Sequence, residues 1–158
     1  MIEIQRSARI EAPAEAVWPV VSSADRAAEW FAFAERVEVL SGEGLGQRRR
    51  QHGQWNGKPS EIDQEIVEYQ PARVLAWCHL AERLNGKPAP RFAASTEFRI
   101  ELEPADGGTV VRLTSSQEPA GPVRAIVMKM FGAKEIAGNL ERSLVKLADI
   151  TARPDDAA

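Results

Sequence analysis

Three consecutive arginines, Arg48 to Arg50, follow three glycines in the segment SGEGLGQRRRQHG, residues 41–53. Glycines beside basic residues raise the question of phosphate binding. A phosphate-binding loop needs a glycine-rich turn that leads into a helix N-terminus, where backbone N–H groups and the helix dipole converge on the anion. Here the glycines precede a segment with the pattern of a strand. The sequence therefore argues against a phosphate loop.

The geometry of a strand separates the three arginines. Successive side chains in a strand point to opposite faces, so Arg48 and Arg50 should share one face and Arg49 should occupy the other. The triplet then forms no single cationic patch, and solvated or salt-bridged strand arginines are the main interpretation. The alternative is that Arg49 faces the interior and meets an acidic group of a ligand.

Two histidines, His52 and His79, are the side chains best suited to proton transfer near neutral pH. If Leu75 and Trp77 share the inner face of their strand with His79, this histidine can orient or protonate a ligand. If the small residues between them form the inner face, His79 has a structural role only. His52 lies near a predicted hairpin, and we expect it to be exposed.

Other catalytic and metal-binding patterns are absent from the sequence. It contains no HExxH motif, no cluster of Cys and His, and no carboxylate spacing typical of a calcium loop, so we expect no metal and no cofactor. It also lacks the GxSxG motif of serine hydrolases. Cys78, the single cysteine, has no motif around it and is interpreted as a small buried residue.

The elements that would position these residues begin with a strand and two short helices. Isoleucines at positions 2, 4 and 10 alternate with polar residues, as in a half-buried strand. Pro13 suits the first turn of a helix, and apolar spacing extends that helix to Ser22. Asp25 is a suitable N-cap for a second short helix through Glu29.

The middle of the chain has the pattern of an antiparallel meander. Between residues 37 and 116, alternating apolar and polar segments are separated by turn residues, among them Asn56-Gly57 and Asp106-Gly107-Gly108. With the first strand, about seven strands are predicted.

The last predicted element is one amphipathic helix from residue 122 to about residue 150. Its apolar residues recur at alternating spacings of four and three. At ~1.5 Å per residue it would extend roughly 40 Å, enough to cross a sheet. Gly132 and Gly138 suggest a bend or a close approach. Ala133 and Ala137 offer small side chains in its middle, with the flexible Met130 nearby.

Length and composition indicate one globular domain. The chain has 158 residues, from which we expect a domain over 1–151 and a flexible tail over 152–158. Its formal net charge of -3 is opposite in sign to that of a typical duplex binder, so no nucleic-acid partner is expected. No apolar run reaches the ~18 residues of a membrane span. We therefore predict a cytoplasmic monomer or homodimer without stable membrane insertion.

This order of elements resembles the START/Bet v 1-like (SRPBCC) superfamily, and within it the polyketide cyclase/dehydrase and lipid-transport family. The resemblance covers residues 2–150. It depends on RIEAPAEAVWPVV at 9–21, Gly46 followed by Arg48-Arg49, IVEYQPARVLAW at 66–77, and the DGGT turn at 106–109. It implies an α+β helix-grip fold: a seven-stranded antiparallel curved sheet around a long C-terminal helix, with two short helices after the first strand.

The resemblance also implies a hydrophobic cavity between the sheet and the helix. The residues expected to bind a ligand there are Trp30, Phe33, Trp77, His79, Phe98, Met130 and Ala133; the alternative for the aromatics is plain core packing. The first hypothesis is binding of a hydrophobic or amphipathic small molecule, such as a lipid, a polyketide or an aromatic metabolite. The second is a polyketide cyclase or dehydratase in which His79 or Arg49 shifts a proton. A third, a co-chaperone-like interaction module, would need an exposed apolar patch.

Overall fold

The computed structural model describes residues 1–55, 57–89, 93–127 and 132–152. Its elements in chain order are β1 (Ile2–Ile10), α1 (Ala14–Ser22), α2 (Ala27–Trp30), β2 (Arg36–Ser41), β3 (Arg48–Trp55), β4 (Lys58–Gln70), β5 (Val74–Leu84), β6 (Lys87–Pro88), β7 (Ala93–Ala105), β8 (Gly108–Pro119), α3 (Pro122–Val127) and α4 (Ala133–Ala152).

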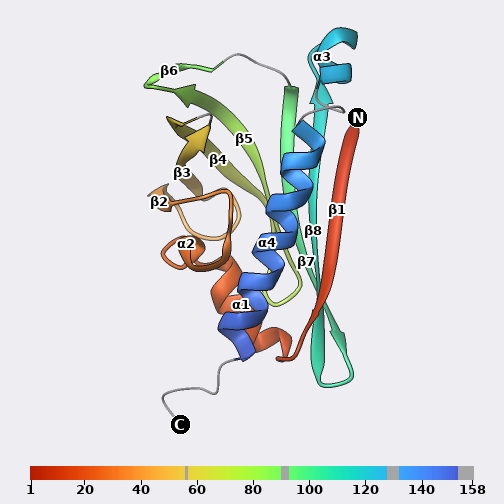
Figure 1. The fold of residues 1–158 in the computed structure, drawn as a ribbon. Coiled ribbons are helices and arrows are strands. Elements are labelled where there is room, and N and C mark those ends of the chain that lie inside the picture. The colour runs from red at the N-terminus through yellow and green to blue at the C-terminus, as the bar shows by residue number, and fades with distance from the viewer. Residues whose placement is uncertain (56, 90–92, 128–131, 153–158) are drawn as a thin grey trace.

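The strands form one antiparallel sheet in the order β1-β8-β7-β5-β4-β3-β2, and the two-residue β6 pairs with β5. Figure 1 shows the sheet curving around α4, with α1 near the C-terminal end of that helix and α2 at the level of its middle. The prediction of seven antiparallel strands and two short helices after the first strand is confirmed. We call the sheet face toward α4 the inner face and the opposite one the outer face.

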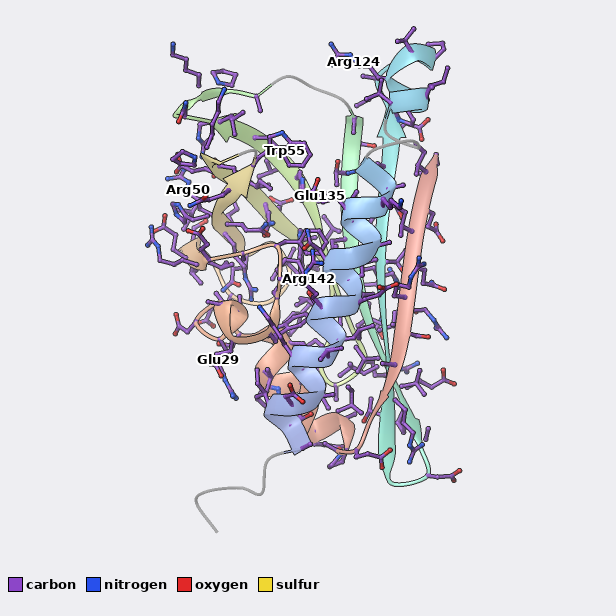
Figure 2. The ribbon with its side chains drawn as sticks, viewed as in Figure 1. Glu29, Arg50, Trp55, Arg124, Glu135 and Arg142 are labelled. Carbon is purple, nitrogen blue, oxygen red and sulfur yellow. The ribbon has the colours of Figure 1, made fainter. Side chains whose placement is uncertain are left out.

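The core lies between the inner face and the helices. Leu140, Leu144 and Leu147 of α4 are buried, at the spacing of four and three that the sequence predicts. They share one hydrophobic cluster with strand residues such as Ile100 and Leu113. The charged residues of α4 lie on its exposed side, as Glu135 and Arg142 show in Figure 2.

The C-terminal helical region differs from the prediction in one respect. The sequence predicts a single helix over 122–150, whereas the structure contains α3 and α4, with residues 128–131 outside the described part. Figure 1 shows the two helices on different axes. Gly132, which suggested a bend, immediately precedes α4. The predicted cap of α2 is also wrong, because its N-cap residue is Arg26, not Asp25.

The outer face carries ion pairs between neighbouring strands. Arg48 pairs with Glu65 at 3.2 Å, and Arg50 pairs with Asp63 at 2.8 Å. Arg83 contacts the same Asp63 at 2.8 Å. The antiparallel register places Arg48 opposite Glu65, Arg50 opposite Asp63 and Arg83 opposite Glu61. The interpretation of Arg48 and Arg50 as salt-bridged strand residues is confirmed.

Two smaller expectations about the outer face are wrong. His52 is not exposed: its side chain is 23% accessible, and its Nε2 lies 2.9 Å from Oε1 of Glu38 on the neighbouring strand. Cys78 is only partly buried. His52 contacts Glu38 of β2, and Cys78 stands opposite Glu65 of β4 and Glu97 of β7 in the sheet register.

Candidate functional site

Arg49 points to the inner face, opposite to Arg48 and Arg50. Its side chain is buried, with 8% of the residue accessible. The register places it beside Gln64 on β4 and Val39 on β2, neither of which is charged. It therefore lacks the cross-strand carboxylate that its two neighbours have.

The hydrogen bonds of Arg49 go to neutral oxygens. Its Nε donates to Oε1 of Gln47 at 2.6 Å, and its Nη2 donates to the carbonyl oxygen of Ser22 at 2.6 Å. Burial lowers the pKa of Arg49 from its usual range, and nearby Tyr69 acts in the opposite direction. Within the described ranges no carboxylate forms an ion pair with this guanidinium.

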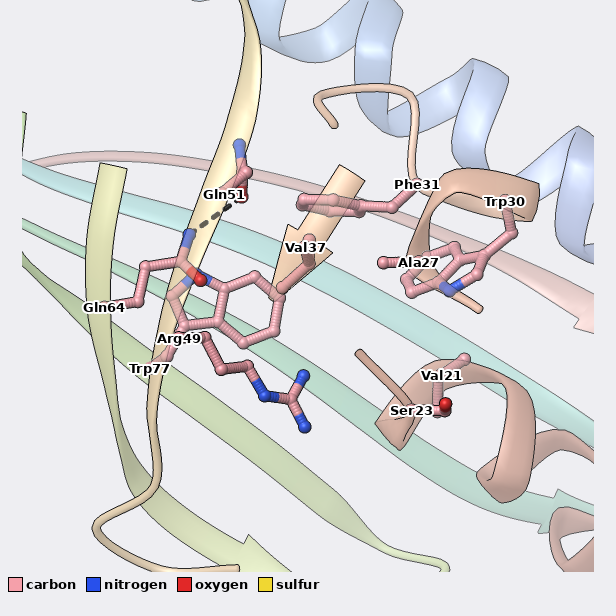
Figure 3. A pocket seen from close by; sticks show the side chains of 10 residues that line it. All are labelled: Val21, Ser23, Ala27, Trp30, Phe31, Val37, Arg49, Gln51, Gln64 and Trp77. Carbon is pink, nitrogen blue, oxygen red and sulfur yellow. Dashed lines mark hydrogen bonds between the residues drawn. The ribbon is translucent and has the colours of Figure 1, made fainter. Parts of the chain in front are cut away.

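Arg49 lines a small pocket beneath α1 and α2, and Figure 3 shows its guanidinium directed toward the end of α1. The pocket has a volume of about 20 Å³, which is the space of one or two water molecules. Its walls are Val21, Ser23, Ala27, Trp30, Phe31, Val37, Arg49, Gln51, Gln64 and Trp77.

Trp30 contributes an unpaired donor to this pocket. The residue is 2% accessible, and its buried Nε1 has no hydrogen-bond partner in the described part of the chain. Buried indole N–H groups usually find an acceptor. In Figure 3 the indole nitrogen lies on the edge of the ring toward Val21, on the same side as the Arg49 guanidinium.

Two buried glutamines complete the polar wall. Gln64 donates from Nε2 to Oε1 of Gln51 at 2.7 Å. Gln51 in turn donates to the carbonyl oxygen of Phe33, at the longer distance of 3.4 Å. Sequence reasoning missed both residues. Gln64 lies between Ile62 and Ile66 at a spacing of two, so the three side chains share one face of the strand. A polar residue on an otherwise apolar face could have identified Gln64 as a candidate.

His79 lies on the inner face, because it stands directly opposite Gln64 in the β4–β5 register. Leu75 and Trp77, at the same phase of β5, belong to the core. Of the two arrangements left open by the sequence, the one with Leu75, Trp77 and His79 inside is the observed one. Arg49, Gln64 and His79 thus form a row across three neighbouring strands, which we call the inner polar row.

The His79 side chain is 16% accessible and only partly satisfied. Its buried Nδ1 has no hydrogen-bond partner among the residues that the structure describes. Oε2 of Glu82 lies 3.9 Å from Nδ1, beyond hydrogen-bonding distance. The imidazole therefore has a ring nitrogen available on the inner side of the sheet, where it can contact a molecule held there.

The predicted aromatic residues contact one another. The rings of Trp77 and Phe98 stack at 4.9 Å between centroids, and Phe31 meets both edge-on, at 5.7 and 5.1 Å. Phe33 lies 5.0 Å from Phe31. We call these four residues the aromatic cluster. Because its rings are in contact, they fill much of the space in which the sequence led us to expect a larger cavity.

Of the two residues predicted from the C-terminal helix, only Ala133 belongs to the described part of the chain. Ala133 is partly buried in the first turn of α4 and does not line the pocket. Met130 lies outside the described residues. Of the predicted ligand-binding residues, Trp30 and Trp77 line the pocket; Phe31, which also lines it, was absent from the prediction.

A second hollow lies on the surface between α2 and β2. This groove has a volume of about 500 Å³ and is bordered by Ala24, Asp25, Ala28, Glu35, Arg36, Val37, Glu38 and Val39. Val37 borders both the groove and the buried pocket. Three charged carboxylates against one arginine make the groove acidic, in contrast to the pocket behind it.

Membrane-spanning helices and metal-binding clusters are both absent from the described residues. No helix in them is long and apolar enough to cross a membrane. No group of three or more His, Cys, Asp or Glu side chains within the described ranges is arranged to hold a metal ion.

A curved antiparallel sheet around a long C-terminal helix, with two short helices after the first strand, is the helix-grip architecture. The chain belongs to the polyketide cyclase/dehydrase and lipid transport family, whose model matches residues 1–150. A search of the curated proteins found no match.

Solved structures of similar fold cover nearly the whole chain. A protein of Thermus thermophilus is 20% identical, with a TM-score of 0.75, over 96% of this chain and 97% of its own. Ara h 8.0201 is 15% identical, with a TM-score of 0.70, over 97% and 99%. The Zhui aromatase/cyclase of Streptomyces sp. R1128 is 22% identical, with a TM-score of 0.71, over 96% and 94%. These likenesses show the fold.

Proposed function

We propose that this protein binds a hydrophobic or amphipathic small molecule, such as a lipid, a polyketide or an aromatic metabolite, against the inner face of its sheet. The observation that carries the proposal is the set of underused polar groups within an apolar interior: Arg49 without a carboxylate, and Trp30 Nε1 and His79 Nδ1 without hydrogen-bond partners in the described part of the chain. A core that served stability alone would leave few such groups, because each costs free energy.

Binding of more than a few atoms at this pocket requires side chains to move. A volume of about 20 Å³ cannot hold a lipid or an aromatic ring system, and the aromatic cluster closes the space beside it. Ligand binding should therefore change the environment of the aromatic rings. Near-ultraviolet circular dichroism of the protein with and without ligand measures this directly. We include Trp30, Phe33, Trp77, His79, Phe98, Met130 and Ala133 among the residues expected to contact the ligand.

Native mass spectrometry of protein purified from its own host tests the proposal. We expect a bound small molecule that is released on denaturation and that identifies the ligand class. Protein that carries no small molecule, and that binds none from a panel of fatty acids and polycyclic aromatics, would contradict the proposal.

The second candidate function is a polyketide cyclase or dehydratase. The inner polar row favours it, since it places a cation, Arg49, and an available imidazole, His79, on one face of three adjacent strands. Arg49 could stabilise an enolate oxygen while His79 transfers a proton. Turnover of a model poly-β-ketone that depends on His79 would support an enzyme over a carrier.

A co-chaperone-like interaction module is the least supported alternative. It would need an exposed apolar patch, and α3 does expose Val123 and Ile126, which are 74% and 59% accessible. With Val127, which is 38% accessible, these residues form only a small patch on a six-residue helix. The inner polar row has no role in this alternative, so we place it third.

A further inference from the structure

We propose that the pocket between Arg49 and Trp30 is a subsite for an anionic oxygen group, so that the ligand is an amphipathic acid bound by its carboxylate or enolate end. This inference rests on the proposed function and specifies the chemistry of the molecule bound.

Arg49 differs from its two strand neighbours because no carboxylate of the described residues balances its positive charge. The strand neighbours of Arg49 each pair with a carboxylate, Arg48 with Glu65 and Arg50 with Asp63. Arg49 itself has only the neutral oxygens of Gln47 and Ser22. Burial of a cation is costly unless an opposite charge compensates it. The partial negative charge at the end of α1 supplies part of that compensation, and an anionic ligand would supply the rest.

The pocket wall carries hydrogen-bond donors that have no acceptor in the described part of the chain. A guanidinium carries five N–H donors, and the two hydrogen bonds of Arg49 use its Nε and Nη2, leaving Nη1 without a partner in the described residues. The indole N–H of Trp30 is a second, independent donor without an acceptor among those residues. No Asp or Glu is among the ten lining residues of the described chain. A carboxylate only accepts hydrogen bonds, so it is the complementary group.

The volume of the pocket limits which part of a ligand it can hold. About 20 Å³ admits one or two oxygen-sized groups, which fits the end of a molecule and not its body. The pocket is bounded on its apolar side by Phe31 and Trp77 of the aromatic cluster. The hydrocarbon part of the ligand would occupy that side and displace these rings, while its oxygens remain beside Arg49 and Trp30.

Two matched pairs of probes test the subsite: decanoate against 1-decanol, and 2-naphthoate against 2-methylnaphthalene. Calorimetry at pH 7 should give at least tenfold tighter binding of each acid than of its neutral partner. Arg49→Gln should abolish that preference, and Trp30→Phe, which keeps a ring but removes the N–H, should reduce it about threefold. The control Arg48→Gln removes an arginine that is already paired on the outer face, and it should leave the preference unchanged.

A spectroscopic measurement keeps the test independent of whether Arg49→Gln folds. The indole N–H resonances of the tryptophans are resolved by ¹H–¹⁵N NMR, and Trp30→Phe identifies the Trp30 signal by its loss. We expect decanoate to shift this signal further downfield than 1-decanol does in the wild-type protein, because a carboxylate accepts a stronger hydrogen bond from the indole N–H than a hydroxyl does.

The outcomes separate the subsite from the proposed function. Equal affinity for acid and neutral probes in the wild-type protein, with no selective shift of the Trp30 signal, would overturn the anion subsite while ligand binding stands. Failure of all four probes to bind would count against the proposed function and would overturn the subsite with it.

Discussion

The guanidinium of Arg49 donates a hydrogen bond to the carbonyl oxygen of Ser22 at 2.6 Å, and Ser22 is the last residue of α1. The last turn of α1 contains no basic residue of its own. The buried cation on β3 therefore interacts with the exposed carbonyl end of α1, where the helix dipole is negative. This hydrogen bond joins β3 of the sheet to α1 beside the pocket.

Loss of that contact should destabilise the protein. For Arg49→Met we expect the free energy of unfolding to fall by about 1 to 3 kcal/mol, because the Ser22 carbonyl oxygen and Oε1 of Gln47 lose their donor and this loss exceeds the relief of the buried charge. Arg49→Lys should lower the free energy of unfolding by less than Arg49→Met does. Urea denaturation measures both, with Arg48→Met as the control, expected within about 0.5 kcal/mol of wild type. An equal effect of Arg48→Met and Arg49→Met would show that the contact with Ser22 contributes little.

Asp63 should make stability depend on acid pH. Hydrogen bonds from Arg50 and Arg83 lower the pKa of Asp63 from 3.8 to about 2. A carboxyl whose pKa is lower in the folded state stabilises that state above the unfolded pKa, and the contribution disappears as the pH falls from about 4 toward 2. Asp63→Asn should cost about 1 to 2 kcal/mol at pH 7, allowing for solvent screening, and almost nothing near pH 2.

Urea denaturation of wild-type and Asp63→Asn protein between pH 2 and pH 7 measures this difference. Glu103→Gln, at an exposed position of β7, is the control and should show no comparable change over the same interval. A constant difference between wild type and Asp63→Asn at every pH would contradict the prediction.

Substitution of His79 distinguishes a carrier from an enzyme. If the protein is a cyclase, His79→Gln should retain ligand affinity within about threefold and lower turnover of a model poly-β-ketone by about 100-fold or more, because the proton-transfer group is lost. His52→Gln, on the outer face beside Glu38, is the matched control. If neither affinity nor turnover responds to His79→Gln, His79 is a structural residue.

Gly53 of β3 lies so close to the backbone of Phe33 that only glycine fits at this position. A Cβ at this position would lie 2.9 Å from the backbone carbonyl oxygen of Phe33. Gly53→Ala should therefore lower the free energy of unfolding by about 1 to 3 kcal/mol through displacement of the backbone around Phe33. Gly121→Ala, where a Cβ meets nothing within 4 Å, should have little effect. Thermal unfolding of the two variants compares them, and equal midpoints would contradict the expected crowding.

Much of the fold follows from local patterns. The turn at Asp106 and Gly107 needs positive φ at both positions, 44° and 83°, and this residue pair supplies it. Alternation along β3 correctly separated Arg49 from Arg48 and Arg50. In these cases the determining interactions lie within a few residues of sequence.

The faces of β5 could not be assigned in the same way. Val74 to Trp77 are all buried, because the inner side chains enter the core while the Arg99–Glu68 ion pair covers the outer side. Because this part of β5 has no exposed face, its sequence shows no alternation of apolar and polar residues. A register shift between Asp63 and Gln64 of β4 changes the pairing beyond His79, and sequence gives no sign of it.

The volume of the cavity also could not be predicted from the sequence. It depends on how far the rings of Phe31, Trp77 and Phe98 approach one another, and these residues come from the segment between α2 and β2, from β5 and from β7. The same composition is compatible with a filled or a hollow interior. The unpaired Nε1 of Trp30 likewise follows from the orientation of one ring, which no local pattern determines.

The linked charges of Arg50, Asp63 and Arg83 have a consequence for heat tolerance. They join β3, β4 and β5 on the outer face, where Glu61 also approaches both arginines within 4 Å. The cost of removing charges from water falls on warming, so a network of this kind gains relative weight at high temperature. The three strands that carry the inner polar row are thus held together on the face opposite to the proposed binding site, and they should be among the last parts of the sheet to unfold on heating.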